Sequence, residues 1–249
     1  MPNVCRVPGV KLEYEYLPGD GPVVVFCPGY ASDMGGTKAT ALLEICQHER
    51  LAMLRFDYSG HGRSGGKFID GTIGSWLEDA AFVISQVVPH QELLLVGSSM
   101  GGWIALLLAL RLKARLRGLL LIAPAPDFTE KLIRPELTPE QLKTLKTLGV
   151  LYQPSEYGEP LPLTQLLLDE GRAHLLLDAP IAVDCPVRIL HGMLDADVPW
   201  RLSLKLAEQL ETPDVRLIFV KDGDHRLSRP RDLGLLGGTL RSLLLQNGC

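Results

Sequence analysis

The chain has 249 residues, of which 46% are hydrophobic and 22% charged, and its net charge is −4. This length and composition fit one globular domain with a large core and exclude a disordered chain. An acidic chain without a lysine and arginine cluster is not typical of a nucleic-acid-binding protein. The longest unbroken apolar run, residues 103–110, is far shorter than the roughly 20 residues of a membrane-spanning helix. We therefore predict no nucleic-acid partner and no membrane span.

The cysteines and the first residues bear on the cellular compartment. The five cysteines are scattered, and none forms a CxxC pair or a zinc-type pair with histidine. This pattern predicts free thiols in a reducing compartment, and no metal site. The first 16 residues contain neither a basic segment leading into an apolar stretch nor an Arg/Ser-rich amphipathic transit peptide. We therefore expect a cytoplasmic location.

Strands and helices are expected to alternate along the chain. Residues 12–16 alternate and are polar, which predicts an antiparallel edge strand. Buried strands are expected at 23–27, 51–56, 93–97, 119–123, 187–192 and 215–220, and helices at 37–48, 73–88, 102–112, 202–210 and 233–245. Continuous apolar strands that alternate with helices indicate an α/β fold, with a mostly parallel, twisted sheet of about eight strands and helices on both faces.

The segment 126–186 interrupts this alternation. It contains no clear buried strand, and its prolines separate short leucine-bearing helices such as 141–148 and 163–168. A structureless loop of this length is rare in a compact domain. We therefore predict a small helical cap at 126–186, inserted into a single domain that spans 1–249.

The pattern with the clearest chemistry is Gly97-Ser98-Ser99-Met100-Gly101, a G-x-S-x-G motif between an expected strand and an expected helix. A sharp strand-to-helix turn needs glycine at both ends, and it lifts the central serine above the carboxyl edge of the sheet. We therefore predict that Ser99 is a nucleophile. The N–H of Met100 begins the helix, so it is free to donate to a developing oxyanion. A plain helix N-cap is the alternative interpretation of the motif.

A serine hydroxyl needs a base that accepts its proton, and we expect that base after the last strand of the sheet. His225 lies there, in the turn-rich loop that follows strand 215–220. The other five histidines lie at helix ends, in the cap or in other turns, and His191 is expected to support the turn after its strand. The sequence therefore predicts that His225 is the general base.

The imidazole in turn needs a carboxylate that orients it and stabilises its charged form. Asp195 follows the fifth buried strand and is the predicted acid, with Asp197 and Asp127 as alternatives. The resulting chain order of Ser99, Asp195 and His225 is typical of an α/β-hydrolase.

A second oxyanion donor is expected from the loop after the first buried strand. This loop reads Cys27-Pro28-Gly29-Tyr30. Gly29 lets the backbone approach the reacting carbonyl, and the N–H of Tyr30 is the candidate donor. The side chain of Tyr30 is equally a candidate for the wall of a pocket.

A competing motif, G-x-G-x-x-G, spans residues 60–65. In a dinucleotide site a helix begins at once, and an acidic residue follows about 20 residues later at the end of a strand. Here the loop continues to Gly71, and the nearest acids, Glu78 and Asp79, fall inside an expected helix. The motif therefore favours a tight turn over a nucleotide site.

Five stretches of the chain match one family: PGYASDMGGTKA, RFDYSGHGRS, VGSSMGGW, DCPVRILHGMLDADVPW and DHR. Over nearly its whole length the sequence resembles the α/β-hydrolase superfamily, and within it the mitochondrial palmitoyl-protein thioesterases that are also described as acyl-glucuronide esterases. The resemblance implies that Ser99 is the nucleophile, Asp195 the acid and His225 the base, with Tyr30 and Met100 as oxyanion donors. It also implies a mitochondrial location as the alternative to the cytoplasm.

Together these observations predict a serine hydrolase that cleaves carboxylic esters or thioesters through an acyl-enzyme, with a small-molecule ester or a palmitoylated protein as substrate. No organic cofactor and no metal are implied, and we expect a monomer or a weak dimer. The alternative function is a non-hydrolytic receptor or scaffold of the same fold that binds a small apolar ligand.

Overall fold

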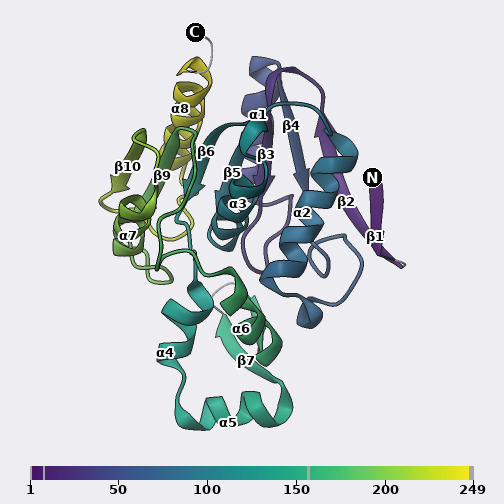
Figure 1. The fold of residues 1–249 in the computed structure, drawn as a ribbon, viewed down its shortest axis with the longest axis vertical. Helices are drawn as coiled ribbons and strands as arrows, with labels where there is room; N and C mark the ends of the chain where they lie inside the picture. The colour runs from purple at the N-terminus through teal and green to yellow at the C-terminus, as the bar shows by residue number, and fades with distance from the viewer. Residues whose placement is uncertain (1, 8, 156–157, 247–249) are drawn as a thin grey trace.

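The sheet predicted from the apolar runs is present in the computed structural model, which describes residues 2–7, 9–155 and 158–246 (Figure 1). Within these residues, eight strands form one sheet in the order β1-β2-β4-β3-β5-β6-β9-β10. Their bounds are β1 (Asn3–Val7), β2 (Val10–Leu17), β3 (Asp20–Cys27), β4 (Leu51–Phe56), β5 (Leu93–Ser98), β6 (Leu116–Ile122), β9 (Val187–Gly192) and β10 (Val215–Val220). The strands from β4 to β10 in this order run parallel, so the fold class is confirmed.

The antiparallel end of the sheet differs from the prediction in one respect. β2 pairs antiparallel with β4, as expected, with Tyr14 opposite Phe56. It is not the edge strand, because β1 pairs with its other side, with Asn3 opposite Glu13. β1 alternates between exposed and half-buried residues. It therefore lacks the buried apolar run by which the other strands were recognised.

Helices cover both faces of the sheet, because alternate residues of each strand point to opposite faces. Val23 and Val25 of β3 join the core on one face, and Val24 and Phe26 join the core on the other. One face packs against α2 (Ile73–Val87), α3 (Met100–Arg111) and α7 (Arg201–Gln209). The opposite face packs against α1 (Thr37–Glu49) and α8 (Pro230–Gln246). Short 3-10 turns, η1 (Phe68–Asp70) and η2 (Lys113–Arg115), lie in the connections.

The predicted cap at 126–186 projects beyond one end of the sheet (teal and green in Figure 1). It contains η3 (Thr129–Ile133), α4 (Arg134–Glu136), α5 (Pro139–Leu148), α6 (Gln165–Gly171) and η4 (Arg172–His174). It also contains a hairpin of two antiparallel strands, β7 (Val150–Ser155) and β8 (Gly158–Thr164), which the sequence analysis did not predict. Pro154, Pro160 and Pro162 hide the strand pattern, and a two-stranded sheet tolerates them because each strand keeps an unpaired edge.

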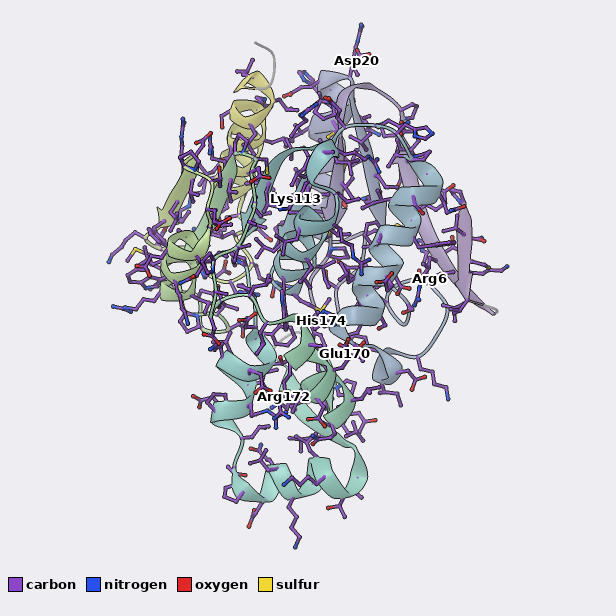
Figure 2. The ribbon with its side chains drawn as sticks, in the orientation of Figure 1. Arg6, Asp20, Lys113, Glu170, Arg172 and His174 are labelled. Atoms are coloured by element: carbon purple, nitrogen blue, oxygen red, sulfur yellow. The ribbon has the colours of Figure 1, made fainter. Side chains whose placement is uncertain are left out.

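Polar contacts tie the cap to the α/β body. Asp127, which is fully buried, accepts hydrogen bonds from the N–H groups of Leu176 at 2.8 Å and Leu177 at 2.9 Å. The two ends of the cap therefore meet at one carboxylate. A second junction involves Glu170 and His174, which are labelled in Figure 2. Glu170 lies 2.6 Å from His174 and accepts from the N–H of Gly74 in α2.

The structure also bears on the expectations about membrane spans and cysteines. Among the described residues, none of the helices has the length and apolar character that crossing a membrane requires. Four of the cysteines are free thiols, namely Cys5, Cys27, Cys46 and Cys185. Cys249 lies outside the described residues.

Candidate active site

The turn between β5 and α3 holds Ser99 in a strained conformation, with φ 55° and ψ −122°. The turn is tight at both ends, as its glycines indicated. A Cβ atom on Gly97 would lie 2.3 Å from the carbonyl oxygen of Gly101, and one on Gly101 would lie 2.0 Å from the carbonyl oxygen of Cys27. Any larger residue would displace the backbone, so the glycines allow the serine to stand clear of the sheet edge.

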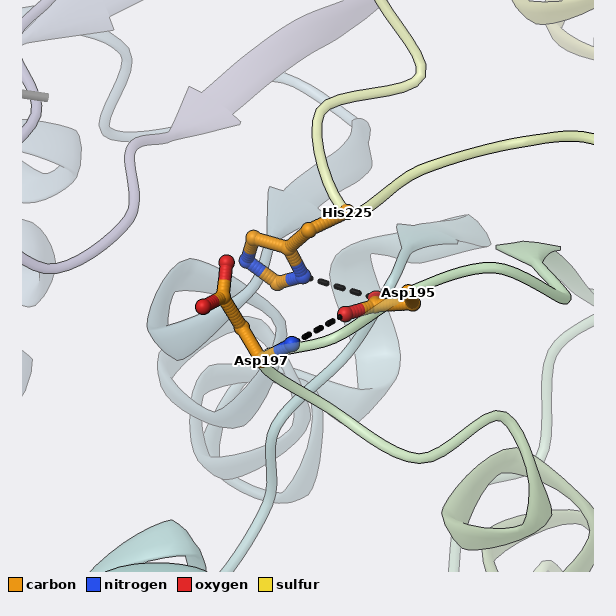
Figure 3. Close-up of side chains that lie close together, drawn as sticks. All are labelled: Asp195, Asp197 and His225. Carbon is orange, nitrogen blue, oxygen red and sulfur yellow. Dashed lines mark hydrogen bonds and ion pairs between the residues drawn. The ribbon is translucent and has the colours of Figure 1, made fainter. Parts of the chain in front are cut away.

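The loop after β10 brings His225 to this serine. Its Nε2 lies 3.1 Å from the Ser99 Oγ, and its Nδ1 lies 2.7 Å from the Oδ2 of Asp195. Figure 3 shows the imidazole and the Asp195 carboxylate joined by this bond. The structure thus brings together the three side chains that the sequence placed after three different strands. In this arrangement Nδ1 donates to the carboxylate, so Nε2 is left to accept the serine proton.

The Asp195 carboxylate is buried and receives four hydrogen bonds. Its Oδ1 accepts from the N–H groups of Asp197 at 2.9 Å and Val198 at 2.7 Å, while Oδ2 accepts from His225 and His191. Burial alone would raise the pKa of Asp195, but the hydrogen bonds from the two histidines and Val198 hold it well below its ordinary value. The carboxylate therefore stays ionised at neutral pH, as an orienting acid must.

His191 supports the loop that carries this carboxylate. Its Nε2 lies 3.1 Å from the Asp195 Oδ2 and 3.0 Å from the carbonyl oxygen of Val198, both of them acceptors. Nε2 therefore carries the hydrogen, and Nδ1 accepts from the Ser203 hydroxyl at 2.7 Å. His191 is fully buried, and its hydrogen bonds stabilise the turn that contains Asp195.

The Nδ1 of His225 is paired with Asp195, and the two alternative acids are placed differently. Asp127 is the tie between the ends of the cap. Asp197 is exposed, and its carboxylate points away from Asp195 (Figure 3). Asp195, Asp197 and His225 offer ligand atoms within 4.8 Å of one another, so they are the residues in the described part of the chain that could hold a metal ion. Both imidazole nitrogens already lie in hydrogen bonds, which favours proton transfer over metal binding here.

The two predicted oxyanion donors flank the serine. Met100 is the first residue of α3, so its N–H has no partner within the helix. On the other side, a Cβ atom on Gly29 would lie 3.3 Å from the Cβ of Ser99, which places the loop after β3 directly against this serine. Tyr30 follows in that loop, and its hydroxyl donates to the carbonyl oxygen of Pro162 in the cap hairpin at 2.6 Å.

A cavity of about 640 Å³ opens above Ser99, and its two sides differ in chemistry. The side beneath the cap is mostly apolar; beside the polar Gln153 it is lined by Tyr30, Phe128, Leu132, Ile133, Leu161 and Leu163. The side between α1 and the His225 loop is polar and is lined by Ser32, Asp33, Thr37, Lys38, Asp197 and Arg226. The cavity therefore suits a substrate with one apolar and one polar part.

The G-x-G-x-x-G segment forms a turn around Asp57. The Asp57 carboxylate accepts from the N–H groups of Met34 at 2.7 Å and Arg63 at 2.9 Å. A Cβ atom on Gly62 would lie 2.2 Å from this carboxylate. The next long helix, α2, begins only at Ile73. The glycines therefore allow a close backbone approach to Asp57, and the helix that a pyrophosphate site needs does not follow them.

Two features of the site were not predicted from the sequence. The side chain of Lys38 lies on the polar side of the cavity and contacts the His225 loop, and the hydroxyl of Tyr30 contacts the cap. Lys38 falls within PGYASDMGGTKA, one of the stretches that match the family. That match was the available sequence signal for a role of Lys38.

A mostly parallel sheet with a serine on a strained strand-to-helix turn, a histidine after the last strand and a cap after β6 defines an α/β-hydrolase. Comparisons with known proteins agree. A family model described as serine aminopeptidase, S33, matches residues 21–169. The mitochondrial palmitoyl-protein thioesterase ABHD10 of Mus musculus is 38% identical over 236 residues, which span 94% of this chain and 79% of that protein.

Two solved structures extend the likeness to the whole fold. A putative hydrolase from Agrobacterium vitis S4 superposes with a TM-score of 0.91 at 43% identity, covering 98% of this chain and 97% of that one. Mouse α/β-hydrolase domain-containing protein 10 superposes with a TM-score of 0.89 at 37% identity, covering 98% of both chains. The chain belongs to the α/β-hydrolase family that includes these relatives, which confirms the resemblance seen in the sequence. It is a hydrolase of the esterase and thioesterase class.

Proposed function

We propose that Ser99, His225 and Asp195 form a catalytic triad that cleaves carboxylic esters or thioesters through an acyl-enzyme. The observation that carries the proposal is the continuous chain of hydrogen bonds from the Ser99 hydroxyl through His225 to the buried Asp195, at the floor of a half-apolar cavity. These positions support the proposed roles, since the carboxylate is held ionised and Nε2 faces the serine hydroxyl.

The reaction follows from these positions. His225 Nε2 takes the hydroxyl proton while Ser99 Oγ attacks the acyl carbon, and Asp195 stabilises the imidazolium that forms. The N–H groups of Met100 and Tyr30 hold the oxyanion of the tetrahedral intermediate. His225 then protonates the leaving alcohol or thiol. In the second half, His225 deprotonates a water molecule that attacks the acyl-enzyme, which releases the acid and restores Ser99.

The substrate proposed here is a molecule with an apolar acyl group, carried by a protein thiol or a small alcohol. The apolar side of the cavity, which includes Phe128, Leu132 and Leu161, supports an apolar acyl chain. The curated relative is named a palmitoyl-protein thioesterase, which supports a palmitoylated protein as the physiological class. The curated relatives are also named mitochondrial proteins, whereas a cytoplasmic location and a monomeric or weakly dimeric state stay predictions.

The nucleophile is tested by Ser99→Ala, with Ser98→Ala as the matched control because it changes the neighbouring serine. We expect Ser99→Ala to fold, to lose about 10³-fold or more of its hydrolytic rate and to escape labelling by a fluorophosphonate probe. Ser98→Ala should keep its hydrolytic rate and its rate of probe labelling within a few-fold of the wild type. Labelling of the Ser99→Ala protein would overturn the assignment.

The substrate class is tested by one series of acyl chains presented both as thioesters and as oxygen esters. We expect kcat/KM to rise from acetyl to long-chain substrates, because the longer chain buries more apolar surface beneath the cap. Absence of a burst and of turnover at every chain length would instead favour the alternative function, an apolar-ligand receptor.

A further inference from the structure

The loop that carries His225 depends on contacts from outside itself. Within the loop, the N–H of Leu227 donates to the Asp224 carboxylate at 2.9 Å, and the Ser228 hydroxyl donates to the carbonyl oxygen of Arg226 at 3.0 Å. These short-range bonds lie within the loop. On the side before His225, the N–H of Leu194 donates to the carbonyl oxygen of Gly223 at 2.8 Å and attaches the loop to the segment after β9. The imidazole must nevertheless stay within reach of both Ser99 and Asp195, so an external anchor next to His225 has a direct effect on the site.

Lys38 provides such an anchor. It lies in the first turn of α1, and its Nζ donates to the carbonyl oxygen of Arg226 at 2.6 Å, across 188 positions of sequence. Arg226 is the residue directly after His225, and both line the cavity with Lys38. An ammonium group makes a stronger hydrogen bond to a carbonyl than a neutral donor does. The bond therefore joins α1, which follows the loop containing Tyr30, to the backbone next to His225.

We propose that Lys38 is a positioning residue of the hydrolytic site, whose ammonium group fixes the backbone at Arg226 and thereby holds His225 in line with Ser99. The inference rests on the proposed function, because it concerns how the base of that reaction is held. Lys38 itself makes no contact with the reacting atoms in this role. It acts through the orientation of the imidazole, so its loss should lower kcat more than it changes KM.

The environment of Lys38 makes this role dependent on pH. Burial lowers the pKa of Lys38 to about 8, with the Arg226 guanidinium acting in the same direction and Asp224 and Asp195 opposing it. The other ionisable groups that line this cavity are Tyr30, Asp33, Asp197 and His225. The ammonium is therefore present below about pH 8 and is lost as the pH rises through that value. A neutral amine holds the Arg226 carbonyl less firmly, so activity should fall on the alkaline side.

The test compares Lys38→Met, Lys38→Arg and the control Lys113→Met, which removes a cation at the exposed η2 turn (labelled in Figure 2). This turn follows the C-terminal end of α3, whereas Ser99 lies at the other end of that helix. At pH 7 we expect Lys38→Met to lose about 10-fold or more in kcat with KM changed by less than about threefold. Lys38→Arg keeps a cation and a donor, so it should restore most of the lost rate. Lys113→Met should match the wild type.

The pH profile of kcat/KM and of the rate of fluorophosphonate labelling provides the second measurement. The wild type and Lys113→Met should show a fall of about threefold or more near pH 8, which Lys38→Arg lacks because a guanidinium stays charged there. Wild-type kcat in Lys38→Met, or an unchanged alkaline fall in Lys38→Arg, would overturn the proposal. Since Lys38→Arg is tested by itself, a folding defect of Lys38→Met leaves the test intact. A failure here with Ser99→Ala still inactive would reject only the role of Lys38, not the triad.

Discussion

Replacing Asp195 with asparagine changes the site through the tautomer of one histidine. The Oδ1 atom of Asp195 holds two backbone N–H groups, so the amide oxygen of an asparagine would take that position. The amide nitrogen would then face Nδ1 of His225, which now lies 2.7 Å from a carboxylate oxygen. Nδ1 would have to accept that hydrogen bond, which moves the ring hydrogen to Nε2. A protonated Nε2 cannot take the proton of Ser99.

The expected loss is therefore that of the base function, not of a single contact. A comparable tautomer change in a serine protease triad costs about 10⁴-fold in kcat, which corresponds to about 5 kcal/mol of activation free energy. The amide nitrogen would also face Nε2 of His191, which carries a hydrogen in the wild type. This donor-to-donor contact should cost about 1–3 kcal/mol of folding free energy.

The assay is the hydrolysis of a p-nitrophenyl acyl ester together with the rate of fluorophosphonate labelling, both at pH 7. Asp197→Asn serves as the matched control, because it makes the same change two residues away on an exposed side chain. We expect Asp195→Asn to lose about 10⁴-fold in kcat and Asp197→Asn to lose far less, because the Asp197 carboxylate does not set the tautomer of His225. The reverse order would show that Asp197 is the orienting acid and would refute the reasoning.

Two further predictions concern the cap and the buried histidine of the GHGRSG motif. Tyr30→Phe leaves the carbonyl of Pro162 without its donor, so we expect thermal unfolding to show about 1–3 kcal/mol less stability. We also expect a lower ratio of the kcat/KM for a long-chain substrate to the kcat/KM for an acetyl substrate. An unchanged ratio would contradict a link between this hydroxyl and the apolar side of the cavity. Burial lowers the pKa of His61 to about 4. Because an unfolded histidine titrates near 6.5, wild-type stability should be full above about pH 6.5 and fall by up to about 3 kcal/mol as the pH drops toward 4. Thermal melts of His61→Phe should show a flatter dependence, and a parallel decline in both proteins would contradict this origin.

The sequence predicted those parts of the fold that leave a local signal. Each buried parallel strand is a continuous apolar run, so strands such as 93–98 could be found without a structure. β1 alternates at an exposed edge, and the hairpin β7–β8 contains prolines, so neither has that signal. The hairpin is stabilised by its place in the cap, which is a property of tertiary structure.

The candidate site divides in the same way. The positions of Ser99, Asp195 and His225 follow from the rule that the carboxyl ends of parallel strands meet at one edge of the sheet. The contact of Lys38 with Arg226 joins segments 188 positions apart, and no pattern along the chain encodes it. Which polar side chains meet across such distances depends on loop conformations that strand order alone does not determine.

The meeting of both ends of the cap at Asp127 has a consequence for how this scaffold can diversify. One carboxylate binds the chain where it returns, at Leu176 and Leu177, close to where it leaves the sheet. The segment between these points is thus a closed loop, which contacts such as that of Glu170 with Gly74 also hold against the body. The free-energy cost of closing a loop grows only slowly with its length. Shortening or exchanging this segment would change the cap residues that line the cavity above Ser99, without altering the strands of the sheet. The substrate specificity of this scaffold can therefore change while Ser99, Asp195 and His225 keep their positions.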